Sequence, residues 1–281
     1  MGLLLFQISC VEISKTHIAE FTLSLNFIIL SNYMNVFITG GLSGLGLDLS
    51  HRFLNDGYTV GVCDLQSNEE AQATVKDGIQ YFQADVLDKE RLAAVIHEFA
   101  QRNNGLDIMV ANAGISMPKA KIPDFDRGRK VIEINVIGVL NTFEPAIHIM
   151  KEQGRGQLVG LGSVAGTVGL PGVAIYGASK SAVINLCESL EIDLASFGIH
   201  VTTIAPGFVE TPLTQHLKHK MPFKISQEEA VDLMYKAILK RKGLYVLPFK
   251  MMLLSRLLYH LPRPLYKFIQ KRDPVGLSEQ H

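Results

Sequence analysis

Tyr176 and Lys180 are the two residues whose types and spacing point most directly to chemistry. They bracket the run Tyr176-Gly177-Ala178-Ser179-Lys180, so on a helix their side chains project from the same face. A free phenol has a pKa of roughly 10 and is a poor base at neutral pH, but a nearby ammonium favours the phenolate. Tyr176 is therefore a candidate general base for oxidising an alcohol and a candidate general acid for reducing a carbonyl. A Tyr and a Lys at this spacing also occur together by chance, so the pair needs support from the rest of the chain.

A glycine-rich segment follows the first expected strand and reads Thr39-Gly40-Gly41-Leu42-Ser43-Gly44-Leu45-Gly46. Glycines let the backbone turn sharply and approach a pyrophosphate, whose charge then lies at the positive end of the next helix. The position between a strand and a helix favours a dinucleotide site over a simple turn. We expect cofactor contacts from Gly40, Ser43, Gly44, Leu45 and Gly46.

Asp64 ends the second expected strand, 18 residues beyond Gly46. An acidic side chain at this place can accept hydrogen bonds from the adenosine ribose hydroxyls and repels a 2′-phosphate. No basic group compensates for that repulsion, because Leu42 and Ser43 occupy the glycine turn and Leu65 follows the carboxylate. The sequence therefore favours NAD over NADP, with an ordinary helix-capping or turn Asp as the alternative.

Strands and helices must position these residues, and short apolar runs alternate with longer amphipathic stretches from Asn35 onward. The expected strands are Asn35–Thr39, Tyr58–Cys63, Ile79–Phe82, Leu106–Ala111, Gln157–Gly162, Ile199–Ala205 and Leu244–Leu247. The expected helices cover residues 45–56, 67–76, 88–104, 126–152, 174–197 and 226–241. Most strand candidates are continuous runs of Val, Ile and Leu, which predicts a parallel sheet covered by helices on both faces.

This alternation predicts an α/β fold, a single doubly wound Rossmann domain with a central parallel sheet of about seven strands flanked by helices. Residues 34–248 form the domain in this prediction. Residues 1–33 are apolar but interrupted by charges. We interpret them as a peripheral N-terminal extension, with Met34 as the functional start and a weak membrane-associating segment as the alternative. Residues 249–281 are interpreted as a basic amphipathic C-terminal extension.

The glycine turn, of the form Thr-Gly-x-x-x-Gly-x-Gly, and the Tyr-x-x-x-Lys pair make residues 35–248 resemble the short-chain dehydrogenase/reductase family. The resemblance implies hydride transfer between a nicotinamide cofactor and an alcohol or carbonyl substrate, which we expect to be hydrophobic. It implies that Ser163, 13 residues before Tyr176, hydrogen-bonds the substrate oxygen. It also implies that Asn135 holds a water linking Lys180 to solvent, with an ordinary structural Asn as the alternative.

Further cofactor contacts follow from the same resemblance. Asp85-Val86 resembles the family's adenine-contacting pair, and Asn112-Ala113-Gly114 resembles its sheet-stabilising turn, with Ala111 where an Asn often stands. Pro206-Gly207, with Thr211 a few residues on, resembles the segment that contacts the nicotinamide carboxamide. Tyr176 and Lys180 are expected to touch the cofactor as well. We expect the protein to form a homodimer or homotetramer.

Residues 208–225 correspond to the family's variable substrate lid, which carries four basic or titratable side chains: His216, Lys218, His219 and Lys220. His216 and His219 have a spacing that could hold a metal, but neither a carboxylate nor a cysteine accompanies them. We expect a solvated basic face here and no metal. Such a face is compatible with a negatively charged group on the substrate.

The C-terminal segment combines apolar and basic residues, with nine Lys or Arg and no Asp or Glu in residues 240–272. Five leucines recur at helical intervals, expected opposite three basic side chains: Leu253, Leu254, Leu257, Leu258 and Leu261, against Lys250, Arg256 and His260. The pattern indicates either an interfacial helix over 249–271 on an anionic membrane or an apolar face that packs on the enzyme's own cleft or a partner subunit. Pro262 and Pro264 break the helix, so it cannot span a bilayer.

Composition argues against several other classes. Lys+Arg and Asp+Glu both number 27, so the strong positive charge of a nucleic-acid binder is missing. Cys10, Cys63 and Cys187 contain no C-x-x-C pair, which favours a reducing, cytoplasmic setting. Three alternatives to an NAD-linked enzyme stay open: an NADP-linked carbonyl reductase, a catalytically silent NAD-binding scaffold and a membrane-associated interaction protein.

Overall fold

A computed structural model describes residues 34–210 and 222–272, all within one compact unit that spans Met34–His281. Thr211 and the lid residues His216, Lys218, His219 and Lys220 lie outside the described residues. The predictions for residues 1–33 fall outside them as well.

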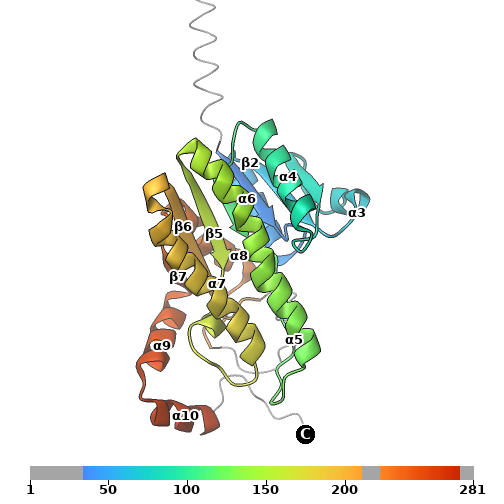
Figure 1. The fold of residues 1–281 in the computed structure, drawn as a ribbon. Helices are drawn as coiled ribbons and strands as arrows, with labels where there is room; N and C mark the ends of the chain where they lie inside the picture. Colours follow the sequence, from blue (N-terminus) through green and yellow to red (C-terminus); the bar gives the residue numbers. More distant parts are fainter. Residues whose placement is uncertain (1–33, 211–221, 273–281) are drawn as a thin grey trace, which may run out of the picture. The chain divides into compact units, whose positions relative to one another are not determined.

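Seven strands in the described residues form one parallel sheet, which confirms the predicted α/β architecture (Figure 1). The strands are β1 (Asn35–Thr39), β2 (Thr59–Asp64), β3 (Ile79–Gln83), β4 (Ile108–Ala111), β5 (Gly156–Leu161), β6 (Ile199–Pro206) and β7 (Leu244–Leu247). Their order in the sheet is β3-β2-β1-β4-β5-β6-β7, and every neighbouring pair is parallel. The chain reverses its direction across the sheet between β1 and β4, and such a switch point opens a crevice at the carboxyl ends of the strands.

Helices cover both faces of the sheet, so successive strand residues are buried in two different clusters. On β1, Phe37 belongs to the cluster that α4 (Lys89–Arg102), α6 (Gly138–Gln153) and α7 (Ala174–Asp193) complete. Its neighbours Val36 and Ile38 belong to the cluster that α2 (Gly44–Asn55) and α8 (Gln227–Leu239) complete. This alternation across the pleat explains why the buried strands read as continuous apolar runs. A short α3 (Asn68–Gln72) lies between β2 and β3.

The helix expected over residues 126–152 is three helical segments in direct succession. They are α5 (Phe125–Ile132), a π-helical turn η1 (Glu133–Ile137) and α6. The π-turn holds Asn135, and such turns recur at functional sites because the wider turn reorients a side chain. Two 3₁₀ turns, η2 (Val164–Gly166) and η3 (Ala195–Phe197), flank α7.

The C-terminal leucines divide between a packed side and an exposed side of their helix. Residues 249–272 form α9 (Phe249–His260) and α10 (Arg263–Arg272), which follow β7 (Figure 1). Met251 of α9 is buried beside Val246, while Leu253 and Leu257 are more than half exposed. Leu254 packs against that buried cluster instead. The reason is that β7 and η2 contact α9 and thereby select which side of the helix turns inward.

Among the described helices, none is both long enough and apolar enough to cross a membrane. In the same part of the chain, no three His, Cys, Asp or Glu side chains are grouped to hold a metal ion.

Candidate active site

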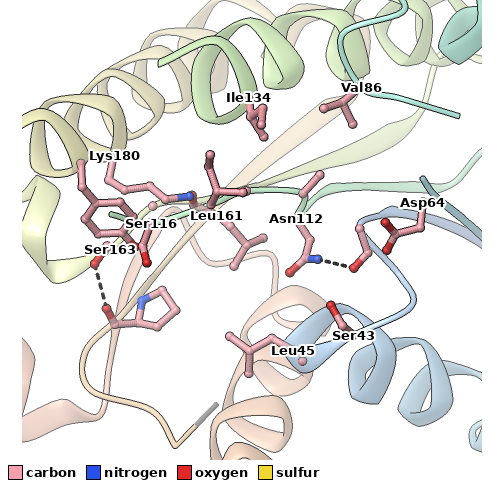
Figure 2. A pocket seen from close by; sticks show the side chains of 18 of the residues that line it. Ser43, Leu45, Asp64, Val86, Asn112, Ser116, Ile134, Leu161, Ser163 and Lys180 are labelled. Carbon is pink, nitrogen blue, oxygen red and sulfur yellow. Dashed lines mark hydrogen bonds between the residues drawn. The ribbon is translucent and has the colours of Figure 1, made fainter. Parts of the chain in front are cut away.

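A cavity of about 730 Å³ lies at the carboxyl ends of the strands, where the switch between β1 and β4 places it (Figure 2). Most of the predicted cofactor contacts line it: Gly40, Ser43, Gly44, Leu45, Asp64, Asp85, Val86, Asn112, Ala113, Gly114, Tyr176, Lys180, Pro206 and Gly207. Because Asp85 follows β3 and Pro206 ends β6, the cavity extends across most of the sheet. Its extent and volume suit an extended ligand such as a dinucleotide.

The glycine turn brings bare backbone to the cavity wall. Gly40 and Gly44 have φ angles of 68° and 53°, in the left-handed region that favours glycine. A Cβ on Gly44 would meet nothing within 4 Å, so the backbone there faces open space as a pyrophosphate site requires. Gly46 does not line the cavity, and a Cβ at this position would lie 2.2 Å from the carbonyl oxygen of Gly40. Gly46 therefore serves close packing inside the turn.

Asn112 fastens the glycine turn to the end of β4. Its side-chain nitrogen donates to the carbonyl oxygens of Thr39 at 3.0 Å and Gly40 at 2.9 Å. Figure 2 draws the second of these hydrogen bonds. The Thr39 hydroxyl in turn accepts hydrogen bonds from the backbone N–H groups of Asn112 and Ala113. The two chain segments on either side of the switch point are thus held at a fixed separation.

Asp64 stands at the end of β2 with its carboxylate turned to the glycine turn. One oxygen accepts from the Leu42 backbone N–H at 3.0 Å, and the other accepts from the Leu65 N–H at 2.9 Å. Asp85 adds a second carboxylate to the same wall. The described lining residues contain two cations, Arg127 and Lys180, and both come from helices beyond β4 in the chain. The end near β2 and β3 is therefore the negative end of the cavity.

Ser163 and Tyr176 face the cavity from the other end, after β5 and on the first turn of α7. The Ser163 hydroxyl donates to the Pro206 carbonyl oxygen at 3.5 Å and accepts from the Ala165 N–H at 3.2 Å. Burial raises the pKa of the Tyr176 phenol, and a hydrogen bond with the Ser163 side chain opposes that increase. Tyr176 is therefore a protonated phenol at neutral pH, close to a hydroxyl.

Lys180 lies one helical turn after Tyr176 and is only 7% exposed. Its Nζ donates to the Leu161 carbonyl oxygen at 2.8 Å. Across the described ranges, no carboxylate forms an ion pair with this ammonium. Burial lowers the pKa of Lys180 to about 8, so the group is still mostly charged at neutral pH.

Asn135 is fully buried and does not line the cavity itself. Its oxygen accepts from the Ile115 N–H at 2.8 Å, while its nitrogen donates to the Ile115 carbonyl and to the Ser179 hydroxyl. A Cβ on Gly114 would lie 3.0 Å from Asn135 Oδ1 and 3.4 Å from Lys180 Nζ. The π-turn thus brings Asn135 to the loop after β4 and to α7 at once, beside Lys180.

Several lining residues were not predicted from the sequence: Cys63, Leu65, Ala84, Ile115, Ser116, Arg127, Ile134, Leu161, Gly162 and Val209. Most are chain neighbours of predicted residues, and adjacency was the signal that could have found them. Arg127 is different, because it lies eight residues before Asn135. Cys63 is buried, and burial raises the pKa of its thiol, so it offers no thiolate to the cavity.

Comparison with known sequences shows that this chain is similar to dehydrogenases and reductases. Residues 34–222 match the sequence model of a family described as short chain dehydrogenase. An uncharacterized oxidoreductase of Myxococcus xanthus is 34% identical over 248 residues, which is 86% of this chain and 98% of the relative. A 3-oxoacyl-[acyl-carrier-protein] reductase of Staphylococcus aureus is 36% identical over 194 residues, which is 66% of this chain and 78% of the relative.

Solved structures agree. The structure titled ElxO with NADP bound is 26% identical to this chain and superposes with a TM-score of 0.66. The match covers 73% of this chain and 90% of that one. The likeness therefore extends over most of both chains.

The first prediction concerns the charge of Lys180 in the cofactor-free protein. With a folded pKa of about 8 and an unfolded value of 10.5, burial of the ammonium costs about 3 kcal/mol below pH 8. This cost is relieved as the pH rises from 8 to 10.5, because the folded protein binds fewer protons than the unfolded chain in that range. Relative to Lys180→Met, the wild-type free energy of unfolding should therefore rise across this window.

Urea unfolding of both proteins at half-unit steps from pH 7 to 10.5 measures that difference. Loss of the hydrogen bond to Leu161 also separates the two proteins, which is why the test uses the change of the difference with pH and not its size at one pH. A difference that stays constant over the whole range would show that Lys180 titrates at its ordinary pKa.

Proposed function

Because the chain belongs to the short-chain dehydrogenase family, we propose that it transfers a hydride between a nicotinamide dinucleotide and the carbinol or carbonyl carbon of a small, mainly apolar substrate. At the level of the family it is an NAD(P)-dependent oxidoreductase. The main support for this hydride-transfer proposal is that Ser163, Tyr176 and Lys180 line the same cavity as the glycine turn and Asp64. Ile115, Ile134 and Leu161 supply apolar wall between them.

The glycine turn, Asp64 and Asp85 would hold the adenosine diphosphate part of the cofactor, and Pro206 and Gly207 would lie beside its nicotinamide ring. When bound, the nicotinamide accepts or donates the hydride. The remaining chemistry is a proton transfer at the substrate oxygen, which this chain's own side chains perform.

In the oxidation direction, Tyr176 Oη takes the proton of the substrate hydroxyl as the hydride leaves the carbon. The Lys180 ammonium, one turn away on α7, favours the phenolate that Tyr176 must form beforehand. Ser163 Oγ donates a hydrogen bond to the substrate oxygen, where negative charge develops. In reduction the same groups act in reverse, and Tyr176 returns its proton to the oxygen. Asn135 positions the Ile115 loop and α7 around Lys180 and, in this proposal, orders a water beside its ammonium.

The second prediction is that Tyr176→Phe lowers kcat by roughly 10²–10⁴-fold, the range typical of general acid–base groups, and leaves cofactor affinity nearly unchanged. The reason is that the substitution removes the proton-transferring hydroxyl and keeps the ring. Tyr245→Phe is the matched control, because Tyr245 does not line the cavity. Turnover of an alcohol and ketone panel, with fluorescence titration of the reduced cofactor, measures both quantities. If Tyr176→Phe kept more than half of wild-type turnover, Tyr176 would have no place in the proton transfer.

We assign NAD as the preferred cofactor on electrostatic grounds. The carboxylates of Asp64 and Asp85 line the end of the cavity that would receive the adenosine, and Leu65 stands where a cation could otherwise neutralise a phosphate. A 2′-phosphate at this end would meet two negative charges. The ElxO structure contains NADP. The proposed preference for NAD therefore rests on Asp64, Asp85 and Leu65 and not on similarity to ElxO.

The third prediction is that the wild type shows a higher kcat/KM with NAD than with NADP, and that Asp64→Asn lowers this ratio roughly tenfold, which corresponds to about 1.4 kcal/mol. Asn removes the charge and keeps an oxygen that can accept from the Leu42 N–H, so the glycine turn stays in place. Asp77→Asn, at an exposed turn away from the cavity, is the control. A wild type that prefers NADP would make the role given to Asp64 untenable.

A homodimer or homotetramer in the cytoplasm completes the proposal. An apolar groove between α6 and α7 supports self-association, with Leu140, Phe143, Ile147, Leu186 and Leu190 in its wall. Leu140 is 42% exposed in the single chain. Pairing of two such faces would bury this surface.

A second proposal, supported by the outer face of α9 and α10, is reversible binding to anionic membranes through residues 249–271. Phe249, Leu253 and Leu257 follow one another at four-residue spacing and are 64%, 52% and 61% exposed. Lys250 and Arg256 are exposed beside this stripe, and residues 240–272 contain no carboxylate side chain. An apolar stripe between cations is the arrangement that inserts shallowly into a negatively charged lipid surface.

The fourth prediction is that the protein co-sediments with phosphatidylserine-containing vesicles at low salt and that binding falls steeply as salt is raised, because screening weakens each cation's contribution of about 1 kcal/mol. Replacing Lys250, Arg256, Arg263 and Lys267 together with Gln should abolish most of the binding and spare cofactor affinity. A matched variant with Arg102, Arg129, Lys130 and Lys236 changed to Gln has the same net charge and should still bind. Equal loss of binding in both variants, or no sedimentation of the wild type, would contradict membrane binding and favour a role of this face in subunit packing.

A further inference from the structure

Arg127 is the cation that the proposed mechanism leaves without a role, although it lines the same cavity as Ser163 and Tyr176. It occupies the first turn of α5, where the Asp124 carboxylate caps the helix by accepting from the backbone N–H groups of Asp126 and Arg127. Asp124 accepts a hydrogen bond from the Arg127 backbone N–H and forms none with its guanidinium. The side chain is thus carried on a regular helix turn and not on an unsupported loop.

Close packing brings this turn to the catalytic end of the cavity. A Cβ on Gly128 would lie 2.3 Å from Cδ1 of Ile175, so α5 presses against α7 at the residue that precedes Tyr176. A larger side chain at position 128 would have to displace the Ile175 side chain. Arg127 therefore lines the cavity from a helix that packs on the helix of Tyr176, whereas Asp64 and Asp85 line it from the ends of β2 and β3.

The charges around Arg127 leave its guanidinium available. Arg129, two residues later, forms an ion pair with Asp126. Over residues 34–210 and 222–272, no ion pair involves Arg127. The other lining cation, Lys180, donates to the Leu161 carbonyl oxygen and is almost completely buried. Arg127 is consequently the one lining cation among the described residues that is free to meet a ligand's charge.

Ser116 extends the polar wall on this side. It follows β4 in the loop that Asn135 holds, and its side chain lines the same cavity (Figure 2). A guanidinium presents parallel N–H donors that match the two oxygens of a carboxylate, and its charge remains at every physiological pH. A hydroxyl and a guanidinium on one side of the reacting carbon are suited to binding an acid group of the substrate.

We propose that Arg127 binds an anionic group, a carboxylate in the first instance, on the substrate, and that the chain acts on oxo or hydroxy acids in preference to neutral ketones and alcohols. This inference rests on the proposed function and adds the substrate class to it. Arg127 then determines specificity, and its charge acts on the substrate and not on the cofactor. The apolar wall binds the carbon chain, and Tyr176 with Ser163 binds the reacting oxygen.

The fifth prediction compares 3-oxo acids of four to ten carbons with their methyl esters as substrates for reduction. In Arg127→Gln, KM for the acids should rise at least tenfold, because a charge-assisted hydrogen bond is lost. KM for the esters and affinity for the reduced cofactor should change less than twofold. Arg127→Lys should recover part of the effect, and Arg129→Gln, whose cation does not line the cavity, should behave as wild type.

A calorimetric titration separates failure of this inference from failure of the proposed function. Tyr176→Phe does not turn substrate over at an appreciable rate in the mechanism above, so it reports binding of 3-hydroxyoctanoate in the presence of NAD. The same variant with Arg127→Gln should bind this acid at least tenfold more weakly. If the wild type reduces esters and acids alike and Arg127→Gln affects both equally, the inference is wrong while the oxidoreductase proposal stands. If neither the acids nor the esters are reduced, the proposed activity is wrong for these compounds, and the titration alone tests Arg127. Equal affinity for 3-hydroxyoctanoate with and without Arg127→Gln would then overturn the role of Arg127.

Discussion

The buried ammonium of Lys180 is the constraint around which the site is arranged. A charged group in the interior costs free energy unless polar groups surround it, and here its hydrogen-bond partner is the neutral carbonyl oxygen of Leu161. Gly114 has no side chain that would crowd the Lys180 Nζ, and the Asn135 side-chain oxygen lies close to the same glycine. Asn135 is there because the helix widens into a π-turn, and it fixes both the loop after β4 and the first turns of α7. The position of Tyr176 depends on each of these contacts, since it shares that helix with Lys180.

Charge is unevenly distributed along the cavity, and this asymmetry gives a ligand its direction. Asp64 and Asp85 make the end near β2 and β3 negative, while Lys180 and Arg127 contribute the positive charges from α7 and α5. A nucleotide without a 2′-phosphate suits the first end, and an acid substrate suits the second. Between these two ends, Asn112 holds the glycine turn and the end of β4 together.

The C-terminal helices join this machinery to the molecular surface. Met251 of α9 packs with Val164 of η2 and Ala205 of β6, which both adjoin catalytic-end residues of the cavity. Tyr266 of α10 donates a hydrogen bond to the Gly169 carbonyl oxygen in the loop between η2 and α7. One side of the segment therefore supports η2, which directly follows Ser163, and the loop from η2 to α7, while the other side presents the apolar stripe and its cations. A contact made at that outer face would be mechanically close to the substrate end of the site.

The sequence by itself determined the sheet, the glycine turn and most of the cavity wall, because each depends on local patterns. Continuous apolar runs such as Asn35–Thr39 are typical of strands buried on both faces, and the carboxyl ends of parallel strands must meet at one edge of a sheet. Only the tertiary structure decided the place of Arg127 and the inward side of α9. Arg127 lies at the cavity because Gly128 and Ile175, 47 positions apart, allow α5 and α7 to touch. Leu253 and Leu257 face outward because β7 and η2 take the opposite side of their helix. Such outcomes depend on contacts between distant segments, and helical periodicity alone does not specify which side of a helix those contacts will cover.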